Sequence, residues 1–348
     1  MGVEEELLLF TSGGQRPAPA GEELAEDPDL DVEHEFKLEQ AEIASEPADS
    51  ADRIASDLRM RRRELIDGAR ERDVLVAALG TSPVGTRPTA TPDERYQRMH
   101  ERFGLVAGDQ LTCGAHVHVG VSSRGEGIVA INGVRRWLAV LLAMTSNSPF
   151  WSGADTGYAS YRNVSWGRWP TAGPTTAFTD PDDYDRVVAG LVAAGAAVDD
   201  GMIYFDARLS AKYPTVEIRV ADVAQHVEDS AVLGALCRAL VDTAVAAEQP
   251  DVPVAMLRAA SWRAARYGLT GDLLDPVDLR PRSAANVIDR LLDTVRLALR
   301  TNDDDQLVAR TVDRLLREGT GAELQRADLA RSDRAHDVVR AAVARTAE

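Results

Sequence analysis

The sequence predicts an α+β protein in which a β-sheet comes first and a helical region follows. Residues 1–222 mix short extended runs with helices and loops, whereas residues 228–345 read almost entirely as helix. The strand-like runs do not alternate regularly with helices, as they would in a parallel α/β fold. With 45% hydrophobic and 27% charged residues, the 348-residue chain has enough apolar side chains for a large buried core.

Local patterns place the elements of the first half. The stretch 51–72 is predicted to be a helix, because Ile54, Leu58 and Leu65 fall on one side of it. The Gly-, Pro- and acid-rich stretch 11–33 is predicted to be a mobile surface loop between two strands. In chain order, we expect strands at 2–10, 74–79 and 111–122, and further helices at 93–103 and 128–146.

The second half begins with a clear helix start. Asp180 is a good N-cap and Pro181 suits the first helical position, so a helix should run to about residue 195. A strand pair turned around Pro214 should follow, and then only helices. The expected strands are 202–209 and 215–220, and the expected helices are 228–248, 253–266, 282–300, 304–317 and 323–345.

The charge balance excludes several classes of protein. With 56 acidic and 39 basic residues the net charge is −17, which disfavours nucleic acids and anionic membranes as partners. The longest apolar run, 137–144, is far shorter than the ~18 residues of a membrane span. No secretory signal is evident, so we expect a cytoplasmic protein. Lys37 and Lys212 are the only lysines, and no Gly-Lys-Ser/Thr motif for a P-loop occurs.

Three strand-like segments each carry an apolar face and an ionisable face. Because side chains alternate along a strand, Glu4 and Glu6 share one face, opposite Val3, Glu5 and Leu7. In the same way His116 and His118 share one face of their segment, and Glu217 and Arg219 share one face of theirs. A solvated sheet face is the simpler interpretation, but such faces are usually built from Lys, Thr, Ser and Gln.

Neighbouring strands of this kind would bring several carboxylates together. Like charges at that distance must be protonated or neutralised, and a divalent cation does the latter. Oxygen ligands with one imidazole suit Mg²⁺ or Mn²⁺ better than zinc. Glu35 and Glu42 belong to a fourth segment, but they are seven residues apart, so a regular strand would place them on opposite faces.

A series of short motifs then occurs in order along nearly the whole chain. They are Gly2-Val-Glu-Glu-Glu-Leu7, Glu35 through Gln40-Ala-Glu42, Cys113-Gly-Ala-His-Val-His-Val-Gly120, Asn147-Ser-Pro-Phe-Trp151, Asp155-Thr-Gly-Tyr-Ala-Ser-Tyr-Arg162, Arg168-Trp-Pro170, Arg208-Leu-Ser-Ala-Lys-Tyr-Pro-Thr-Val-Glu-Ile-Arg219, Ala264-Ala-Arg-Tyr-Gly268 and Gly319-Thr-Gly-Ala322. With these motifs the chain resembles the glutamate–cysteine ligase type 2 family, also described as ATP-dependent carboxylate–amine ligases.

The resemblance implies a fold related to glutamine synthetase, in which a curved antiparallel sheet forms a funnel-like active site backed by helices. It implies a single catalytic domain over 1–348, with the sheet and the metal and ATP site in 1–222 and a mainly helical part in 223–348. ATP would phosphorylate a carboxylate, typically the γ-carboxyl of glutamate. An amine such as cysteine would then attack the acyl phosphate, giving a γ-glutamyl amide, ADP and phosphate.

The resemblance also implies roles for individual residues. The expected metal ligands are Glu4, Glu6, Glu35, Glu42, His116 and Glu217, for Mg²⁺ or Mn²⁺. Arg219 and Lys212 are expected to bind ATP, and Arg219 and His116 to act in catalysis. Arg162, Tyr158 and His118 are expected in the substrate pocket, where a guanidinium could bind an α-carboxylate. A salt bridge within the sheet remains the alternative for Arg219, and a hydrogen bond to a ligand the alternative for His118.

Other features have two interpretations. The aromatic-rich segment 150–169 either lines a pocket or forms a separate hydrophobic cluster. Cys113 shares the apolar face of its strand, so we expect a core residue and not a nucleophile. His116-Val-His118 also fits a zinc-dependent amide hydrolase, although the barrel pattern of that class is missing. A non-catalytic nucleotide-binding relative is the third option. The amine acceptor and the oligomeric state, a homodimer among the options, stay open.

Overall fold

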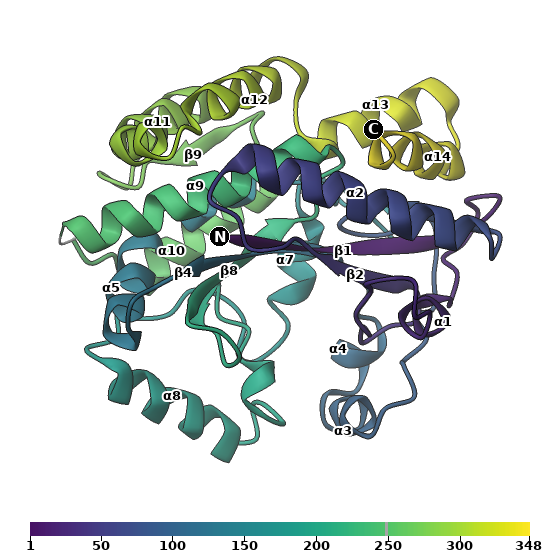
Figure 1. The fold of residues 1–348 in the computed structure, drawn as a ribbon, viewed down its shortest axis with the longest axis horizontal. Helices are drawn as coiled ribbons and strands as arrows, with labels where there is room; N and C mark the ends of the chain where they lie inside the picture. The colour runs from purple at the N-terminus through teal and green to yellow at the C-terminus, as the bar shows by residue number, and fades with distance from the viewer. Residues whose placement is uncertain (248–249) are drawn as a thin grey trace.

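The computed structural model describes residues 1–247 and 250–348. Its centre is a six-stranded antiparallel sheet in the order β2-β1-β4-β8-β7, with β3 pairing with the far half of β1 (Figure 1). The strands are β1 (Gly2–Thr11), β2 (Gln40–Ala44), β3 (Val74–Ala77), β4 (Gly114–Gly120), β7 (Ala207–Leu209) and β8 (Thr215–Asp222). The N-terminal strand therefore lies inside the sheet, between β2 and β4.

Long helices cover one face of this sheet. Helices α2 (Ala51–Arg70) and α9 (Val227–Ala246) lie side by side across it, and most of the residues of α9 are buried (Figure 1). The remaining helices of the last third are α10 (Val254–Tyr267), α11 (Ala284–Thr301), α12 (Asp305–Glu318), α13 (Gly321–Ser332) and α14 (Ala335–Thr346). The predicted antiparallel sheet backed by helices, with a helical C-terminal third, is confirmed.

Shorter elements surround the other face. They are α1 (Gly21–Ala25), α3 (Glu94–Phe103), α4 (Leu105–Gly108), α7 (Tyr161–Trp166), α8 (Pro181–Ala193) and the 3₁₀ turn η1 (Asp200–Met202), whereas α5 (Arg124–Val134) and α6 (Leu138–Met144) pack against α9 and α10 of the helical side. Figure 1 shows α3 and α8 on the side of the sheet opposite α2, with space between them. Two small hairpins, β5 (Phe150–Trp151) with β6 (Ala154–Asp155) and β9 (Asp272–Leu274) with β10 (Pro281–Ser283), lie outside the main sheet.

A buried ion pair joins the helical layer to β1. Glu5 points to the helical side, as the alternation predicts, and its carboxylate accepts two 2.7 Å hydrogen bonds from Nε and Nη2 of Arg62 in α2. Arg62 also donates to the carbonyl oxygens of Ala224 and Gln225, and Ser230 donates to Glu5. Both charged side chains are almost fully buried, so this pair fixes α2 and the start of α9 against the strand.

Several predicted elements are interrupted, each for a local reason. The helix predicted at 128–146 is two helices, α5 and α6, bent by 66° where the amide of Trp137 bonds to the carbonyl of Val134, one residue short of the α-helical register. The helix predicted at 323–345 breaks at Asp333, whose φ of +55° is left-handed.

Two further predictions differ from the structure. Of the strand predicted at 202–209 only 207–209 forms the ladder with β8. The carbonyl of Asp206 still accepts a hydrogen bond from the Arg219 amide of β8, but its own amide donates to Gly173 instead. The loop predicted at 11–33 contains the short helix α1. Residue 248, the predicted end of one helix, lies outside the described residues.

Among the described residues, no single helix has the length and apolarity needed to cross a membrane, and one bent pair, α5 with α6, meets that test only when the two are taken together. Every residue of α6 is buried within the protein.

Candidate active site

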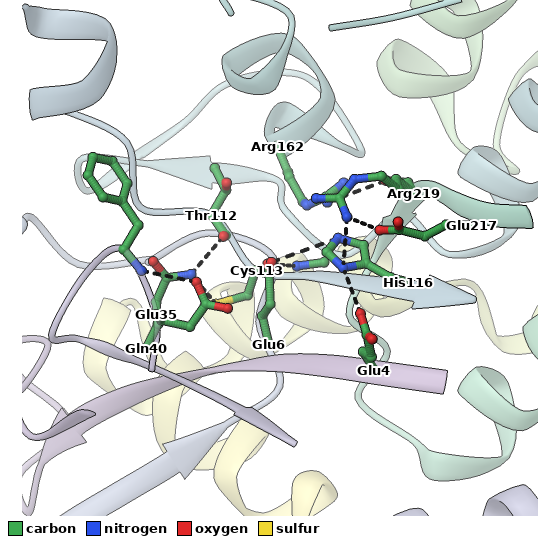
Figure 2. Close-up of polar contacts among 12 residues, drawn as sticks. Glu4, Glu6, Glu35, Gln40, Thr112, Cys113, His116, Arg162, Glu217 and Arg219 are labelled. Carbon is green, nitrogen blue, oxygen red and sulfur yellow. Dashed lines mark hydrogen bonds and ion pairs between the residues drawn. The ribbon is translucent and has the colours of Figure 1, made fainter. Parts of the chain in front are cut away.

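Ionisable side chains form a row across the face of the sheet opposite α2. The strand register sets Glu42 of β2 opposite Glu6 of β1, and Glu4 opposite His116 of β4. The row continues with His118 opposite Glu217 of β8, and Glu217 opposite Arg208 of β7. Five strands thus contribute one or two polar groups each. Figure 2 shows Glu4, Glu6, His116, Glu217 and Arg219 pointing toward one another.

A bulge in β8 brings Arg219 into this row. Between two regular pairs, His116 alone on β4 lies opposite both Arg219 and Val220 on β8. Such a bulge adds one residue and re-aims the side chains around it. The Arg219 guanidinium consequently lies 3.5 Å from Nδ1 of His116 and forms an ion pair with Glu217. Alternation alone indicated the correct face for Arg219 but could not indicate the bulge.

Glu35 reaches the row from a loop and not from a strand. Strand β2 begins only at Gln40, and the chain turns before it, with the amide of Gln40 bonded to the carbonyl of Lys37. Glu33 forms an isolated bridge with Glu42. This turn removes the difficulty raised by the seven-residue spacing, because Glu35 and Glu42 do not belong to one regular strand.

The row forms the floor of a cavity of about 290 Å³. Glu4, Glu6, Glu35, Glu42, His116, His118, Glu217, Arg219 and Lys212 all line it. All the predicted metal ligands therefore share one cavity, together with both residues predicted for catalysis and both predicted for ATP. A wider adjoining cavity of about 550 Å³ shares Arg208, Lys212 and Tyr213 with it.

The floor offers three overlapping sets of metal-binding atoms. Each set has three donor atoms within 4.8 Å of one another, and the sets are Glu4 with His118 and Glu217, Glu4 with Glu42 and His116, and Glu6 with Glu35 and Glu42. Nε2 of His116 is buried and has no hydrogen-bond partner among the described residues. Carboxylate oxygens with one imidazole are ligands that Mg²⁺ and Mn²⁺ accept, so the residues present fit such a cation.

The carboxyls on the β2 side of the floor resist ionisation. Burial, followed by the neighbouring Glu6 charge, raises the pKa of Glu35 to about 7. Burial and the charges of Glu35, Glu4 and Glu6 raise the pKa of Glu42 well above its usual value. Burial also raises the pKa of Glu6, although Arg162 and the Gly114 amide oppose it. A bound cation would neutralise the repulsion between these neighbouring carboxylates.

We expect cation binding to strengthen as the pH rises through 7. The raised pKa of Glu35 means that a proton occupies its carboxyl below about pH 7, and the cation must displace that proton. Mn²⁺ titrations by calorimetry at pH 6 and pH 8 should show weaker binding at pH 6, with proton release there. Glu35→Gln should flatten this dependence. Equal affinities at the two pH values in the native protein would contradict the assignment of Glu35.

The β8 side of the floor stays ionised. Burial alone would raise the pKa of Glu217, but the Arg219 and Arg208 guanidiniums outweigh it and hold the pKa below the usual range. Arg208 Nε donates to Glu217 Oε2 at 2.6 Å and Nη2 to Oε1 at 3.2 Å. His116 sits beside these cations, and burial together with Arg219 lowers its pKa to about 4. A neutral imidazole is the form that can bind a metal.

The side chain of His118 in β4 lies close to the carboxylates of Glu4 and Glu217. Its Nε2 is 3.1 Å from Glu4 Oε1, and its Nδ1 is 2.9 Å from the Thr215 hydroxyl. Burial would raise the pKa of Glu4, but hydrogen bonds to His116 and His118 lower it. His118 is therefore a neighbour of Glu4 and a member of one metal-binding set, while the substrate-binding role that the resemblance implies for it stays a prediction.

Two residues predicted for the substrate pocket do not line the cavity. Arg162 is 2% exposed and lies on the same side of the sheet as the floor residues, where Nη2 donates to the carbonyl oxygen of Arg219 at 3.5 Å (Figure 2). A Cβ on Gly114 would come within 2.1 Å of that Nη2, so only glycine leaves room for this guanidinium. Tyr158 packs against Tyr161 and beneath Arg266 instead. Buried Arg162 serves as a counter-charge for Glu6.

Aromatic side chains also line the cavity, and the sequence predicted only some of them. Trp166 and Trp169 line it, as one interpretation of the aromatic segment predicted, whereas Trp151 and Tyr161 of the same segment pack against each other elsewhere. Phe36, Tyr96 and Tyr204 come from other parts of the chain and were not foreseen. Cys113 is buried, as predicted, and burial raises the pKa of its thiol well above the usual value.

Comparisons with known proteins show the family to which the chain belongs. The family model for glutamate-cysteine ligase family 2 matches residues 1–345. A Frankia alni protein is 47% identical over 97% of this chain and 94% of its own length, and one from Streptomyces avermitilis is 44% identical over 99% of both. Both carry names of the form "Putative glutamate--cysteine ligase 2".

Solved structures share the fold at low sequence identity. A glutamate–cysteine ligase from Francisella tularensis in complex with AMP aligns with a TM-score of 0.68 and 13% identity, over 100% of this chain and 88% of its own. The ligase PafA, in its complex with the prokaryotic ubiquitin-like protein Pup, aligns with a TM-score of 0.51 and 11% identity, over 97% of this chain and 72% of its own.

Proposed function

The chain belongs to glutamate-cysteine ligase family 2, and from that membership we propose that it joins the γ-carboxyl of glutamate to an amine at the expense of ATP. It is an ATP-dependent carboxylate–amine ligase, which forms a carbon–nitrogen bond. The observation that carries the finer proposal is the row of acids, imidazoles and guanidiniums on the floor of one cavity. We propose the whole chain as one catalytic domain, with the helical last third supporting the sheet.

The floor residues suit the first step, transfer of the γ-phosphoryl group to a carboxylate. Glu4, Glu6, Glu35, Glu42, His116 and Glu217 would hold Mg²⁺ or Mn²⁺, which when bound neutralises charge on the triphosphate. A carboxylate oxygen of glutamate bonds to the γ-phosphorus while the bond to the β-phosphate oxygen breaks, and ADP leaves. Arg219 and His116, 3.5 Å apart, are placed to bind the oxygens of the transferring group.

The second step joins the two substrates. The lone pair of a neutral amine attacks the acyl carbon, the carbon–oxygen bond to the phosphoryl group breaks, and inorganic phosphate leaves with that electron pair. The nitrogen loses one proton to solvent or phosphate as the amide forms.

We propose that the nucleotide binds at the β8 end of the floor. Lys212 lies on the loop between β7 and β8, where both cavities meet, and the neighbouring Tyr213 ring contacts His118 edge-on at 5.9 Å. We assign the triphosphate to this end, near Lys212 and Glu217. The adjoining cavity of about 550 Å³ would then receive the nucleoside.

Incubation with ATP, Mg²⁺ and glutamate tests the proposal directly. Hydroxylamine should trap the acyl phosphate as a hydroxamate, and a panel of amines should give products with the mass of γ-glutamyl amides. Phosphate release should require Mg²⁺ or Mn²⁺ together with glutamate. Zinc-dependent amide hydrolysis without ATP would favour the hydrolase alternative. Absence of any Mg²⁺-dependent thermal shift at millimolar ATP would favour a non-catalytic relative.

A further inference from the structure

The main chain at Glu35 is held differently from that of the other residues proposed to bind the cation. Those other residues all belong to strands of the sheet, whose ladders fix their main chain: Glu4, Glu6, Glu42, His116 and Glu217. Glu35 instead lies between two isolated bridges, one joining Glu33 to Glu42 and the other joining Lys37 to Ala90. The position of Glu35 at the floor therefore depends on contacts from outside the sheet.

A single residue, Thr91, donates hydrogen bonds to the main chain at Glu35 and at the next residue. Thr91 belongs to the connection between β3 and α3, residues 78–93, and lies 56 positions after Glu35. Its hydroxyl donates to the carbonyl oxygen of Glu35 at 2.5 Å, and its amide donates to the carbonyl oxygen of Phe36 at 3.1 Å. Thr91 is 7% exposed, so water has little access to replace these bonds.

The connection is itself anchored to the chain that follows Glu35. The amide of Thr89 donates to both carboxylate oxygens of Glu39, at 3.0 and 2.9 Å, and Glu39 is 3% exposed. The carbonyl oxygen of Thr89 accepts from the amide of Leu38 at 3.0 Å. These bonds hold the connection beside residues 38–39, so that Thr91 is a fixed point for the main chain at Glu35.

The other end of the connection is fixed to the start of α3. The carbonyl oxygen of Thr91 accepts from the amide of Asp93 at 2.8 Å, and the carboxylate of Asp93 caps α3. In α3 the ring of Tyr96 packs against that of Phe36, with centroids 5.2 Å apart. Phe36, the residue after Glu35, is thus held by Thr91 at its main chain and by α3 at its ring.

We propose that Thr91 is a positioning residue for the cation, which holds the main chain of Glu35 so that its carboxylate lies beside those of Glu6 and Glu42. Donor atoms of these three acids lie within 4.8 Å of one another. A group that orients a metal ligand governs affinity without touching the ion. The inference rests on the proposed function, because it takes Glu35 as a ligand of the cation that this function uses.

Thr91→Val tests the proposal, because it replaces the hydroxyl by a methyl group and keeps the main-chain bond to Phe36. Calorimetric titration with Mn²⁺ at pH 8 should show binding weakened by about five- to tenfold, as expected for the loss of one bond that orients a ligand. The apparent KM for Mg²⁺ in phosphate release should rise by a similar factor, while kcat at saturating Mg²⁺ should change little. Thr91→Ser keeps the hydroxyl and should bind Mn²⁺ as the native protein does. Native affinity in a folded Thr91→Val protein would overturn the proposal.

Combination with Glu35→Gln separates positioning of Glu35 from a general structural role. Thr91→Val should weaken Mn²⁺ binding no further in a Glu35→Gln protein, because the ligand that it positions is already lost. An equal loss in both backgrounds, or native affinity in Glu35→Gln alone, would overturn the proposal. Thr86→Val is the control, because it makes the same change in the same connection at a residue that lines a separate surface cavity. It should leave Mn²⁺ affinity unchanged, and the melting temperature of each variant checks the fold.

Cation binding separates failure of this inference from failure of the proposed function, since calorimetry with Mn²⁺ requires no turnover. If Thr91→Val binds Mn²⁺ normally while the native protein releases phosphate with glutamate, the ligase assignment stands and the role of Thr91 is wrong. If the native protein binds Mn²⁺ but releases no phosphate with glutamate, ATP and Mg²⁺, the proposed function fails, and calorimetry still decides the role of Thr91. If the native protein binds no Mn²⁺, both fail.

Discussion

Replacing Glu217 by Gln should reduce glutamate-dependent phosphate release by about 10³-fold or more while the protein stays folded. The change removes one anionic donor from the floor and leaves Arg208 and Arg219 without the carboxylate that positions both. Loss of a ligand and of charge positioning at a phosphoryl-transfer site typically costs several kcal/mol of transition-state stabilisation. Phosphate release under saturating ATP and Mg²⁺ measures the effect.

The shape of glutamine matches that of glutamate, so gross unfolding is not expected at this 2% exposed position. Circular dichroism and the melting temperature check the fold, and calorimetry with Mn²⁺ should show weaker binding. Glu318→Gln, on the exposed end of α12, is the control and should behave like the native protein. Phosphate release within threefold of the native rate in a folded Glu217→Gln protein would falsify the assignment of this floor as the catalytic site.

Replacing Arg62 by Met should lower the free energy of unfolding by about 3–5 kcal/mol, the cost typical of breaking a buried ion pair by removing one partner. Among the described residues, Glu5 would keep only Ser230 as a side-chain hydrogen-bond partner, and it would remain fully buried on the helical side of β1. The carbonyl groups of Ala224 and Gln225 would also lose their donor. Urea unfolding, followed by circular dichroism, measures the loss.

Arg63→Met is the matched control, because Arg63 is the next residue of the same helix but is exposed. It should change stability by less than about 0.5 kcal/mol. The double variant with Glu5→Leu and Arg62→Met should recover a large part of the loss, since an apolar pair leaves no buried charge. If the single Arg62→Met variant has the same midpoint of urea unfolding as the native protein, the Glu5–Arg62 pair does not hold the helical layer to the sheet.

Much of the candidate site could be predicted from the sequence, because the pattern that indicates it lies within single strands. Alternation in β1, β4 and β8 assigned Glu4, Glu6, His116 and Glu217 to one face, and a two-residue period cannot be shifted without exposing the apolar face. The role of Arg208 could have been found in the same way, because a hairpin turned around Pro214 sets it opposite Glu217.

Features that depend on long-range packing could not be derived from such patterns. Nothing local to Tyr204 indicates that its ring meets Trp166 and Trp169, and nothing local to Tyr96 indicates that its ring meets Phe36. The burial of Arg162 depends on a contact with Gly114, 48 positions earlier in the chain, where the absence of a side chain leaves the space. The break between α5 and α6 falls at Arg135-Arg136-Trp137, none of which is a helix breaker, so composition gave no warning of it.

The central position of β1 has a consequence for biosynthesis. Strand β1 is made before its neighbour β4, which follows about a hundred residues later, and β8 follows another hundred after that. Residues 2–5 of β1, which pair with β4, therefore keep an unpaired edge until β4 has been made, and an unpaired strand edge is a typical start for aggregation. Premature termination before residue 215 would leave a nascent chain that can complete neither the sheet nor its catalytic surface, so quality control should recognise such fragments as misfolded.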